Sequence, residues 1–162
     1  MIDLEQAQHE MTDICEMIDI RMATEDDIPR ILEIENDAFT PPWPHGALLS
    51  EIINKASCFL VATSNDTLLH GFAILRQVGD ESELFQIAVD KPVRGNGIAD
   101  TLLNAVMSWV RERGVKKIFL EARVGNAAAI SLYKKHRFNT VGRRKGYFTQ
   151  PVEDAFIMTI EL

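Results

Sequence analysis

Two glycines one residue apart mark a turn in the stretch IAVDKPVRGNGIADTLL, residues 87–103, where an apolar run gives way to a helical pattern. Gly95 and Gly97 keep the backbone accessible, because glycine has no Cβ and adopts positive φ without strain. The first N–H groups of a helix lack intrahelical partners and bind phosphate, with help from the positive end of the helix dipole. The stretch therefore predicts an anion-binding turn between a strand and a helix.

Three kinds of phosphate-binding turn compete for this stretch. A P-loop needs Lys followed by Ser or Thr after its last glycine, whereas Ile98 follows Gly97. A dinucleotide-binding turn needs Gly or Ala at its sixth position, which is Asp100 here, and an acid about 20 residues further on. An acyl-coenzyme A turn has Arg or Gln, then x-x-Gly-x-Gly/Ala, and Arg94, Gly97 and Ala99 match it. Taken alone, the short pattern is also typical of any helix that begins after a glycine turn.

Three further side chains of chemical interest follow in LEARVGNAAAISLYKKHRF. Glu121 ends an apolar run, Asn126 begins a helical pattern, and Tyr133 lies on one face of that helix. Each has an ordinary structural explanation, namely a solvated carboxylate, a helix N-cap and a packed aromatic ring. Cys58 has apolar neighbours and is expected to be a buried thiol, and the four histidines show no metal-ligand spacing. We therefore expect no metal site.

The elements that must position these residues alternate along the chain. Thr24 followed by three acids predicts an N-cap. The runs CFLVAT, HGFAILRQV and ELFQIAVD are typical of three strands, the first two joined at the turn SNDT, and helical periodicity follows the glycine turn. Strands are expected at 18–23, 58–63, 70–78, 83–90, 116–122, 138–148 and 154–161, and helices at 24–38, 44–55, from 98 onward, and at 126–136. The pattern predicts an α/β fold with a mixed sheet and helices on both faces.

The totals suit a single globular domain, because 162 residues with 46% hydrophobic content can bury a sizeable core. No apolar run approaches the length of a membrane span, and the acidic start has no signal-peptide pattern, so a cytoplasmic location is expected. Cys15 and Cys58 have no CxxC spacing. Residues 1–54 hold 13 acidic against 2 basic side chains, although the net charge is only −7. This polarity indicates either two solvated faces or an acidic half that attracts a basic acceptor.

Taken together, these motifs resemble the GNAT acyltransferase superfamily, and within it the RimI type, the ribosomal-protein-alanine N-acetyltransferases. The resemblance runs from about residue 19 to the C-terminus through FTPPW, QIAVD, RGNGIA, LEARVGN, LYKKHRF and GYFTQPVEDAFIM. It implies the GNAT fold, with a mixed, mostly antiparallel central sheet of about seven strands and helices on both faces. Residues 18–162 would form one GNAT domain, after an extension at 1–17 of unknown role.

The resemblance also implies an activity and a set of roles. Acetyl would pass directly from acetyl-CoA to the N-terminal alanine α-amine of a small-subunit ribosomal protein, without metal, membrane or nucleic acid, in a monomer or weak dimer. Glu121 would be the general base and Tyr133 the general acid. The implied coenzyme contacts are Ile87, Ala88, Val89, Arg94, Gly95, Asn96, Gly97, Ile98, Ala99, Asp100 and Asn126. The expected acceptor pocket comprises Trp43, Tyr147, Glu153 and Asp154, and the Val89 N–H would face the oxyanion.

Four positions depart from the family pattern. Ala99 stands where glycine is commoner, Gly125 where Ser is frequent, and Phe148 where a second Tyr is frequent. Arg137 replaces the usual Gly after the helix, which implies strain if that residue is left-handed. Two other functions stay open on the sequence alone. One is a GNAT enzyme that acetylates another protein or a small-molecule amine, and the other is a non-catalytic acyl-CoA-binding regulator.

Overall fold

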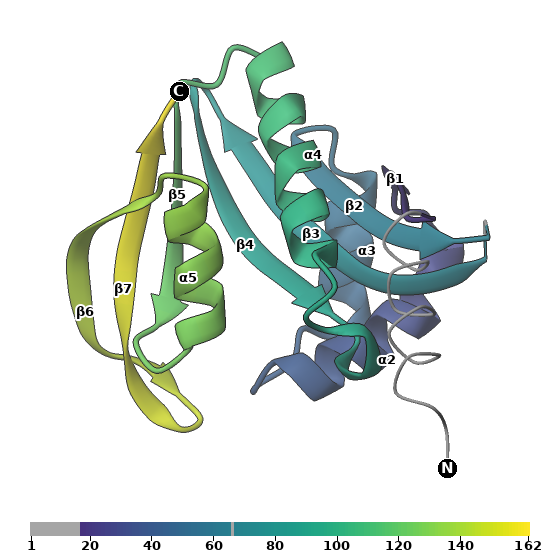
Figure 1. Cartoon of the computed structure of the whole chain (residues 1–162), viewed down its shortest axis with the longest axis horizontal. Coiled ribbons are helices and arrows are strands. Elements are labelled where there is room, and N and C mark those ends of the chain that lie inside the picture. Colours follow the sequence, from purple (N-terminus) through teal and green to yellow (C-terminus); the bar gives the residue numbers. More distant parts are fainter. Residues whose placement is uncertain (1–16, 66) are drawn as a thin grey trace, which may run out of the picture.

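The fold was analysed in a computed structural model that describes residues 17–65 and 67–162 (Figure 1). The predicted extension lies, apart from Met17, outside the described residues, and so does Cys15. A seven-stranded sheet runs in the order β1-β2-β3-β4-β5-β7-β6. Only β4 and β5 are parallel neighbours, and every other pair is antiparallel. The strands are β1 (Asp19–Met22), β2 (Ser57–Ser64), β3 (Leu68–Val78), β4 (Glu81–Val89), β5 (Lys117–Arg123), β6 (Asn139–Thr149) and β7 (Val152–Glu161).

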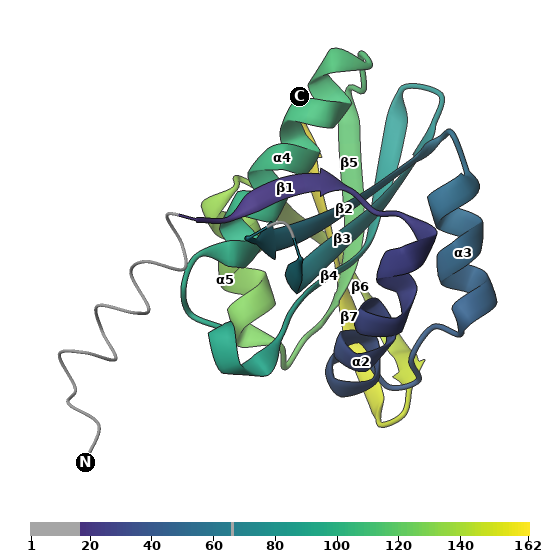
Figure 2. The ribbon, with the colours of Figure 1, turned by 90° about the vertical axis from the view of Figure 1, so that its right-hand side faces the viewer.

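Helices cover both faces of this sheet (Figure 2). Helices α2 (Ile28–Ala38) and α3 (His45–Ile53) pack on one face, against β2, β3 and β4. Helix α4 (Ile98–Glu112) packs on the other face, beside α5 (Ala127–Lys135). The predicted fold class is confirmed, and the predicted helices and strands are all present with small shifts at their ends. No helix in the described part of the chain is both long and apolar enough to cross a membrane.

The entry into α2 shows how local sequence sets an element. After β1, the Asp27 carboxylate accepts hydrogen bonds from the Thr24 N–H, at 2.8 Å, and from the Thr24 hydroxyl, at 3.2 Å. A short 3-10 turn, η1 (Glu25–Asp27), therefore precedes the α-helix. Pro29 lies in the first turn of α2, where its missing N–H costs no intrahelical hydrogen bond.

The parallel pair β4 and β5 separates after only four residue pairs. Residues 81–84 of β4 pair with 117–120 of β5, and no pairing continues beyond Leu84. A bulge lies at this point, because Leu84 faces Leu75 of β3 while Gln86 faces Ile74, which leaves Phe85 as the extra residue. Such a bulge bends its strand. Beyond it β4 and β5 diverge, as Figure 1 shows, and within residues 17–65 and 67–162 no strand pairs with the β5 side of residues 86–89.

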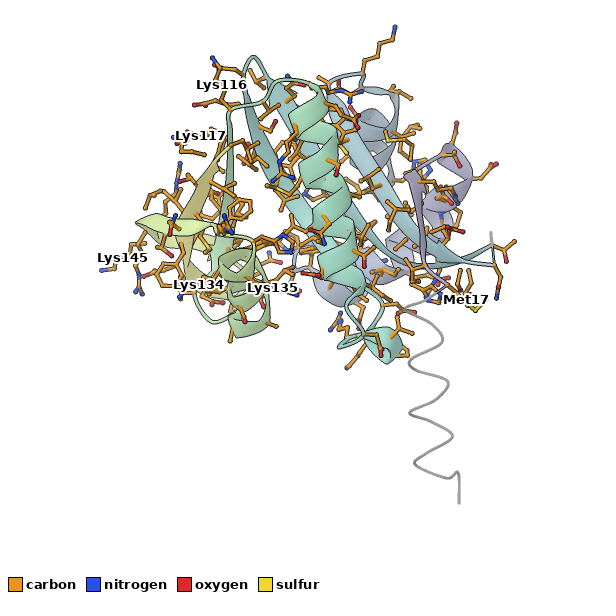
Figure 3. The ribbon with its side chains drawn as sticks, turned by 45° about the horizontal axis from the view of Figure 1, so that its top comes forward. Met17, Lys116, Lys117, Lys134, Lys135 and Lys145 are labelled. Carbon is orange, nitrogen blue, oxygen red and sulfur yellow. The ribbon has the colours of Figure 1, made fainter. Side chains whose placement is uncertain are left out.

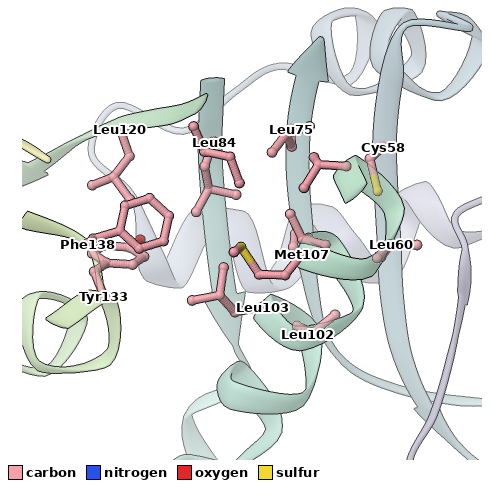
Figure 4. Packing of buried hydrophobic residues seen from close by; sticks show 14 of the residues in the cluster. Cys58, Leu60, Leu75, Leu84, Leu102, Leu103, Met107, Leu120, Tyr133 and Phe138 are labelled. Carbon is pink, nitrogen blue, oxygen red and sulfur yellow. The ribbon is translucent and has the colours of Figure 1, made fainter. Parts of the chain in front are cut away.

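The main core lies between the sheet and the two helices α4 and α5. Helix α4 contributes an apolar stripe that includes Leu102, Leu103 and Met107, all nearly or completely buried. Figure 4 shows these side chains packed toward β2, β3 and β4, with Phe138 and Tyr133 stacked beside Leu120 of β5. The core therefore joins the glycine turn, which begins α4, to the helix that carries Tyr133.

Helix α5 ends in a left-handed residue that is not glycine. Arg137 has a φ of +68°. Its N–H donates to the Lys134 carbonyl at 2.9 Å, and the Phe138 N–H donates to the Tyr133 carbonyl at 3.0 Å. This pair of bonds is a Schellman motif, in which glycine normally fills the left-handed position. The strain expected for Arg137 from the sequence is therefore present.

Candidate active site

A cavity of about 430 Å³ opens where β4 and β5 diverge. One wall is the segment that follows α2, another is β4, and the third consists of β5, the start of α5 and strand β6. Of the residues predicted from the sequence to form the site, Glu121, Tyr133, Ile87, Asn126, Trp43 and Tyr147 line it together. The structure thus brings together residues that lie as far apart in the sequence as 43 and 147.

Glu121 lies on β5 with its side chain 12% exposed. One carboxylate oxygen is 3.2 Å from Nε of Arg144 on β6. The hydroxyl of Tyr147 is hydrogen bonded to the same carboxylate, and this bond is the main reason that the pKa of Tyr147 rises to about 12. The predicted base is thus a carboxylate held between a guanidinium and a phenol, at the edge of the cavity.

Tyr133 combines packing with a place in the cavity wall. Its ring is 7% exposed and packs against Phe138 with the ring centroids 5.8 Å apart (Figure 4). Burial raises the pKa of its phenol well above the usual value of 10. The hydroxyl group therefore keeps its proton at neutral pH, as a general acid must. Tyr133 is thus both a core residue, as its position on the helix face suggested, and part of the cavity lining.

The glycine turn has the geometry of an anion-binding loop. Gly95 and Gly97 have φ of +82° and +80°, which glycine adopts without cost. Helix α4 begins directly after Gly97, and its first intrahelical bond joins the Thr101 N–H to the Gly97 carbonyl at 3.0 Å. The N–H groups of residues 98–100 consequently have no partner within the helix. A pyrophosphate group fits such an arrangement.

Two side chains of the turn are engaged in shaping it. Asn96 donates from Nδ2 to the Val93 carbonyl at 2.8 Å. Arg94 donates from Nε to the Val89 carbonyl at 2.8 Å and lies 3.3 Å from Asp37. Both contacts fix the backbone of the turn.

Asp100 contributes to the turn through its backbone rather than its charge. Its carboxylate accepts a hydrogen bond from Nε2 of His136 at 2.7 Å and lies 3.0 Å from Nζ of Lys135. These two partners lower the pKa of Asp100, with His136 as the larger cause. The negative charge is therefore balanced by residues at the end of α5, beside the turn where an anion would bind. Ile98, the first residue of α4, is buried in the core, and Ala99 packs at the edge of the same core.

The backbone of β4 beyond the bulge offers hydrogen-bonding groups to the cavity side. The Asp90 N–H donates to the His70 carbonyl of β3 at 2.7 Å. Because backbone groups alternate along a strand, those of Ala88 point toward β3 like those of Asp90. Those of Ile87 and Val89 point away from β3, toward the gap left by β5. An extended ligand segment would find the Ile87 and Val89 N–H groups at this edge.

Asn126 is the N-cap of α5, and its Oδ1 accepts from the Ala129 N–H at 3.2 Å.

Trp43 is held in the opposite wall by Glu35, which accepts from the Trp43 N–H at 2.6 Å and from Nε2 of Gln86 at 2.9 Å. Glu35 is fully buried, and burial raises its pKa. No sequence motif marked Glu35, although its carboxylate positions the segment that carries Trp43.

Glu153 and Asp154, predicted for the acceptor pocket, are not among the residues that line the cavity. Glu153 accepts from the Gly125 N–H at 2.7 Å and lies 3.2 Å from Arg123. A Cβ at residue 125 would come within 2.8 Å of Glu153 Oε2, so the departure to glycine makes room for this carboxylate. Asp154 accepts from Nε of Arg143 at 2.7 Å and from the Gly146 N–H at 2.8 Å. Asp154 therefore links β7 to β6, whereas Glu153 links β7 to β5 and to the loop that follows it.

Arg123 connects two walls of the cavity. It was not predicted to be a site residue, although the motif that contains it was noted. Its guanidinium donates to the Thr40 carbonyl at 3.1 Å and to the Gln150 and Pro151 carbonyls, also at 3.1 Å. It also lies 4.2 Å above the ring of Phe148. Its place in the LEAR motif, two residues after Glu121, was the available signal.

Charge is distributed unevenly over the surface. Figure 3 shows that Lys116, Lys117, Lys134, Lys135 and Lys145 lie on the half formed by β5, β6, β7 and α5, away from Met17.

Cys58 is fully buried, and burial raises its pKa to about 12, which makes it a core thiol as expected. Within residues 17–65 and 67–162, no group of three or more His, Cys, Asp or Glu side chains is placed to hold a metal ion.

Comparison with known proteins agrees with this geometry. The sequence model of the acetyltransferase (GNAT) family matches residues 28–138. A [ribosomal protein bS18]-alanine N-acetyltransferase of Haemophilus ducreyi is 35% identical over 148 residues, which cover 88% of this chain and 99% of that protein. The crystal structure of the ribosomal-protein-S18-alanine N-acetyltransferase from Escherichia coli is 34% identical, with a TM-score of 0.80, and the match covers 90% of this chain and 94% of that one.

A third relative extends the same likeness. The crystal structure of a ribosomal-protein-alanine N-acetyltransferase from Brucella melitensis is 28% identical, with a TM-score of 0.77, over 89% of this chain and 99% of that one. GNAT acetyltransferases use acetyl-CoA as the acetyl donor. The matched family, the cavity between diverging strands and the glycine turn agree with one another, and the chain belongs to the GNAT family of acetyltransferases, in which it resembles the RimI type.

Proposed function

We propose that this protein transfers acetyl from acetyl-CoA to the N-terminal alanine α-amine of a ribosomal protein of the bS18 type. The observation that carries the proposal is the match to bS18-alanine N-acetyltransferases along 84% or more of this chain and 92% or more of theirs. Residues 18–162 act as one catalytic domain in this proposal. Acetyl-CoA supplies an activated acyl group as a thioester, and the rest of the chemistry falls to the protein.

The residues present suit the binding of this coenzyme. The N–H groups of residues 95–100 would hold the pyrophosphate, since two positive-φ glycines and a helix N-terminus meet there. The N–H groups of Ile87 and Val89 would bind the extended pantetheine arm in place of a neighbouring strand, and the Val89 N–H would face the developing oxyanion. Asn126 lines the cavity together with Ile87, where it can contact the coenzyme.

Two side chains carry the proton transfers in this proposal. A free α-amine has a pKa near 7.7–8.0, so its ammonium form gives up a proton to Glu121 more readily than a lysine ammonium with a pKa near 10.4 would. Tyr133 keeps its proton because burial raises its pKa, and it can donate that proton to the leaving thiolate. Both side chains line the same cavity. Trp43 and Tyr147 provide aromatic walls for the first residues of the acceptor.

The test is acetylation of a synthetic peptide that begins with alanine and carries basic residues and one internal lysine. We expect mass spectrometry to locate the acetyl group on the α-amine. A matched peptide with a blocked N-terminus should stay unmodified. Glu121→Gln should lower kcat near pH 7 by about 10²–10⁴-fold, with recovery at high pH where the amine deprotonates unaided.

Three results would overturn parts of this proposal. Acetylation of free lysine or a polyamine in preference to the peptide would favour an enzyme for another amine. Coenzyme binding without transfer to any amine would favour the acyl-CoA-binding regulator. An unchanged rate for Glu121→Gln at pH 7 would remove Glu121 from the role of base. The carboxylate of Glu153 is engaged by Arg123 and the Gly125 N–H, so it is a poor replacement.

A further inference from the structure

We propose that Glu35 is a positioning residue for the acceptor, and that it works as a neutral carboxyl group paired with the side-chain amide of Gln86. Glu35 is not among the described residues that line the cavity, but it holds the wall segment at residues 39–43, which does line it. The inference deepens the proposed acetylation of a peptide α-amine and rests on it, because this segment carries Trp43.

Glu35 binds the wall segment at both of its ends. Its backbone carbonyl accepts from the Phe39 N–H at 3.0 Å, where α2 ends. Its Oε1 accepts from the Trp43 N–H at 2.6 Å. The chain between these two residues therefore leaves Glu35 and returns to it, which fixes the place of the Trp43 ring. That ring packs against Phe85, the extra residue in the bulge of β4, with the ring centroids 5.6 Å apart.

The side-chain partner of Glu35 lies on β4, directly after the bulge. Nε2 of Gln86 donates to Oε1 of Glu35 at 2.9 Å, and Gln86 itself lines the cavity. The next residue along the strand is Ile87, whose N–H is proposed to bind the coenzyme. The acceptor wall and the strand edge proposed to hold the coenzyme are thus joined through one carboxyl oxygen of Glu35.

Two oxygen atoms of this pair are buried without a partner. Oε2 of Glu35 and Oε1 of Gln86 make no hydrogen bond within the described part of the chain. An unpaired buried acceptor costs free energy, and a buried carboxylate that is ionised costs more. A proton on Oε2 makes this oxygen a donor, and Oε1 of Gln86 is an acceptor on the group already bonded to Glu35. The acid and the amide then form two hydrogen bonds, one in each direction.

The surroundings of Glu35 favour its neutral form. Burial raises its pKa, against the opposing effect of its hydrogen bonds to Trp43 and Gln86. Titratable groups on neighbouring elements of this side of the sheet are Glu51 on α3, Arg76 on β3, Glu83 on β4 and, nearer the start of α2, His70 and Asp90. Arg76 is bound to Glu51, and Asp90 to Arg30. Among residues 17–65 and 67–162, no charged group is a cause of the shift at Glu35.

The neutral pair holds the acceptor wall and takes no part in proton transfer. Ionisation of Glu35 would remove the hydrogen bond from Oε2 and leave two acceptor oxygens facing each other. The link between β4 and the Trp43 segment would loosen, and binding of the acceptor peptide would weaken more than binding of the coenzyme. Glu121 keeps the proposed role of base, because Glu35 does not touch the reacting atoms.

The first experiment does not depend on activity. Infrared spectra of the wild type and Glu35→Gln are compared at about pH 6, where a glutamate with the ordinary pKa of 4.5 is ionised. We expect the C=O stretch of a protonated carboxyl group in the wild type and its loss in Glu35→Gln. If the wild type loses only the bands of an ionised carboxylate on this substitution, the inference is overturned, whether or not the peptide is acetylated.

The second experiment separates KM from kcat for the alanine-initiated peptide. Glu35→Ala should raise the peptide KM about tenfold, with kcat and coenzyme affinity little changed, because the Trp43 segment is no longer preorganised. Glu35→Gln should restore the wild-type KM, since its amide can donate to Gln86 as the neutral acid does. The matched control is Glu33→Ala, because Glu33 is an exposed residue of the same helix and is not among the described residues that line the cavity. Its KM should stay within about twofold of the wild type.

The outcomes separate the two proposals. A wild type that leaves every amine unmodified contradicts the proposed function, while the infrared spectra still decide whether Glu35 is neutral. A peptide-acetylating enzyme with an unchanged KM in Glu35→Ala contradicts the positioning role alone. A KM raised as much in Glu35→Gln as in Glu35→Ala would show that the ionised carboxylate is needed, and would also overturn the inference. If Glu35→Ala does not fold, a raised KM in Glu35→Gln overturns the inference and a wild-type KM supports it.

Discussion

Replacement of Arg137 by glycine should stabilise the protein. Arg137 has a φ of +68°, and a residue with a Cβ pays about 1–2 kcal/mol for the left-handed conformation. Glycine removes that strain but gains about 0.4–1 kcal/mol of entropy in the unfolded chain. No ion pair of the Arg137 guanidinium is present among the described residues, so little else is lost. The expected net gain is about 0.5–1 kcal/mol in the free energy of unfolding.

The assay is urea and thermal unfolding of the wild type, Arg137→Gly and Arg137→Ala. For a chain of this length, about 1 kcal/mol corresponds to roughly 2–4 °C in Tm. Alanine removes the same charge but keeps the Cβ, so the difference between the two variants measures the backbone strain less the unfolded-chain entropy that glycine adds. If Arg137→Gly is no more stable than Arg137→Ala, the left-handed Schellman position after α5 carries no cost and the argument fails.

Four other outcomes are expected. Gly97→Glu should abolish coenzyme A binding in calorimetry with the fold intact, because bulk and negative charge enter the turn, whereas Gly46→Glu on exposed α3 should bind normally. Phe138→Ala should cost about 3–5 kcal/mol in urea unfolding, since its ring is buried against Tyr133. Asp100 has a lowered pKa in the folded state, so its stabilising effect is present above pH 3.8 and lost as the pH falls through the folded value. The stability difference between wild type and Asp100→Asn should therefore shrink only below pH 3.8. Finally, kcat/KM for a basic peptide should fall between 20 and 300 mM salt, as the Debye length shrinks from roughly 20 to 6 Å, with kcat little changed, whereas a neutral peptide should show no such dependence.

Local signals explain how much of the fold was predictable. Thr24, Gly97 and Asn126 each stand directly before a helical segment, and each marks its start in the structure. These residues act through backbone geometry and hydrogen bonds within a few positions, which a sequence displays openly. The same holds for Arg137, because a left-handed residue after a helix follows from the local Schellman motif.

Long-range pairing explains what was not predictable. The divergence of β4 from β5 depends on the bulge at Phe85, and that bulge is defined only by the register against β3. The nearness of Glu83 to Glu121 likewise follows only from the register between β4 and β5. Glu153 was expected in the acceptor pocket, and no local signal indicated its partners, Arg123 and the Gly125 N–H, which lie 30 and 28 residues away in the sequence. The role of Glu153 in acceptor binding stays a prediction.

The order of the strands has a consequence for the synthesis of the protein. Strand β7 lies between β5 and β6, so the edge of β5 that faces away from β4 gains its neighbour only when residues 152–161 are available. Translation adds about 5–20 residues per second, so β5 waits on the order of seconds for this neighbour. During that interval the first four strands and α4 can already assemble, because their pairing is complete without β7. The nascent chain therefore acquires the glycine turn before it acquires a finished wall around Glu121, and coenzyme binding can precede catalytic competence on the ribosome.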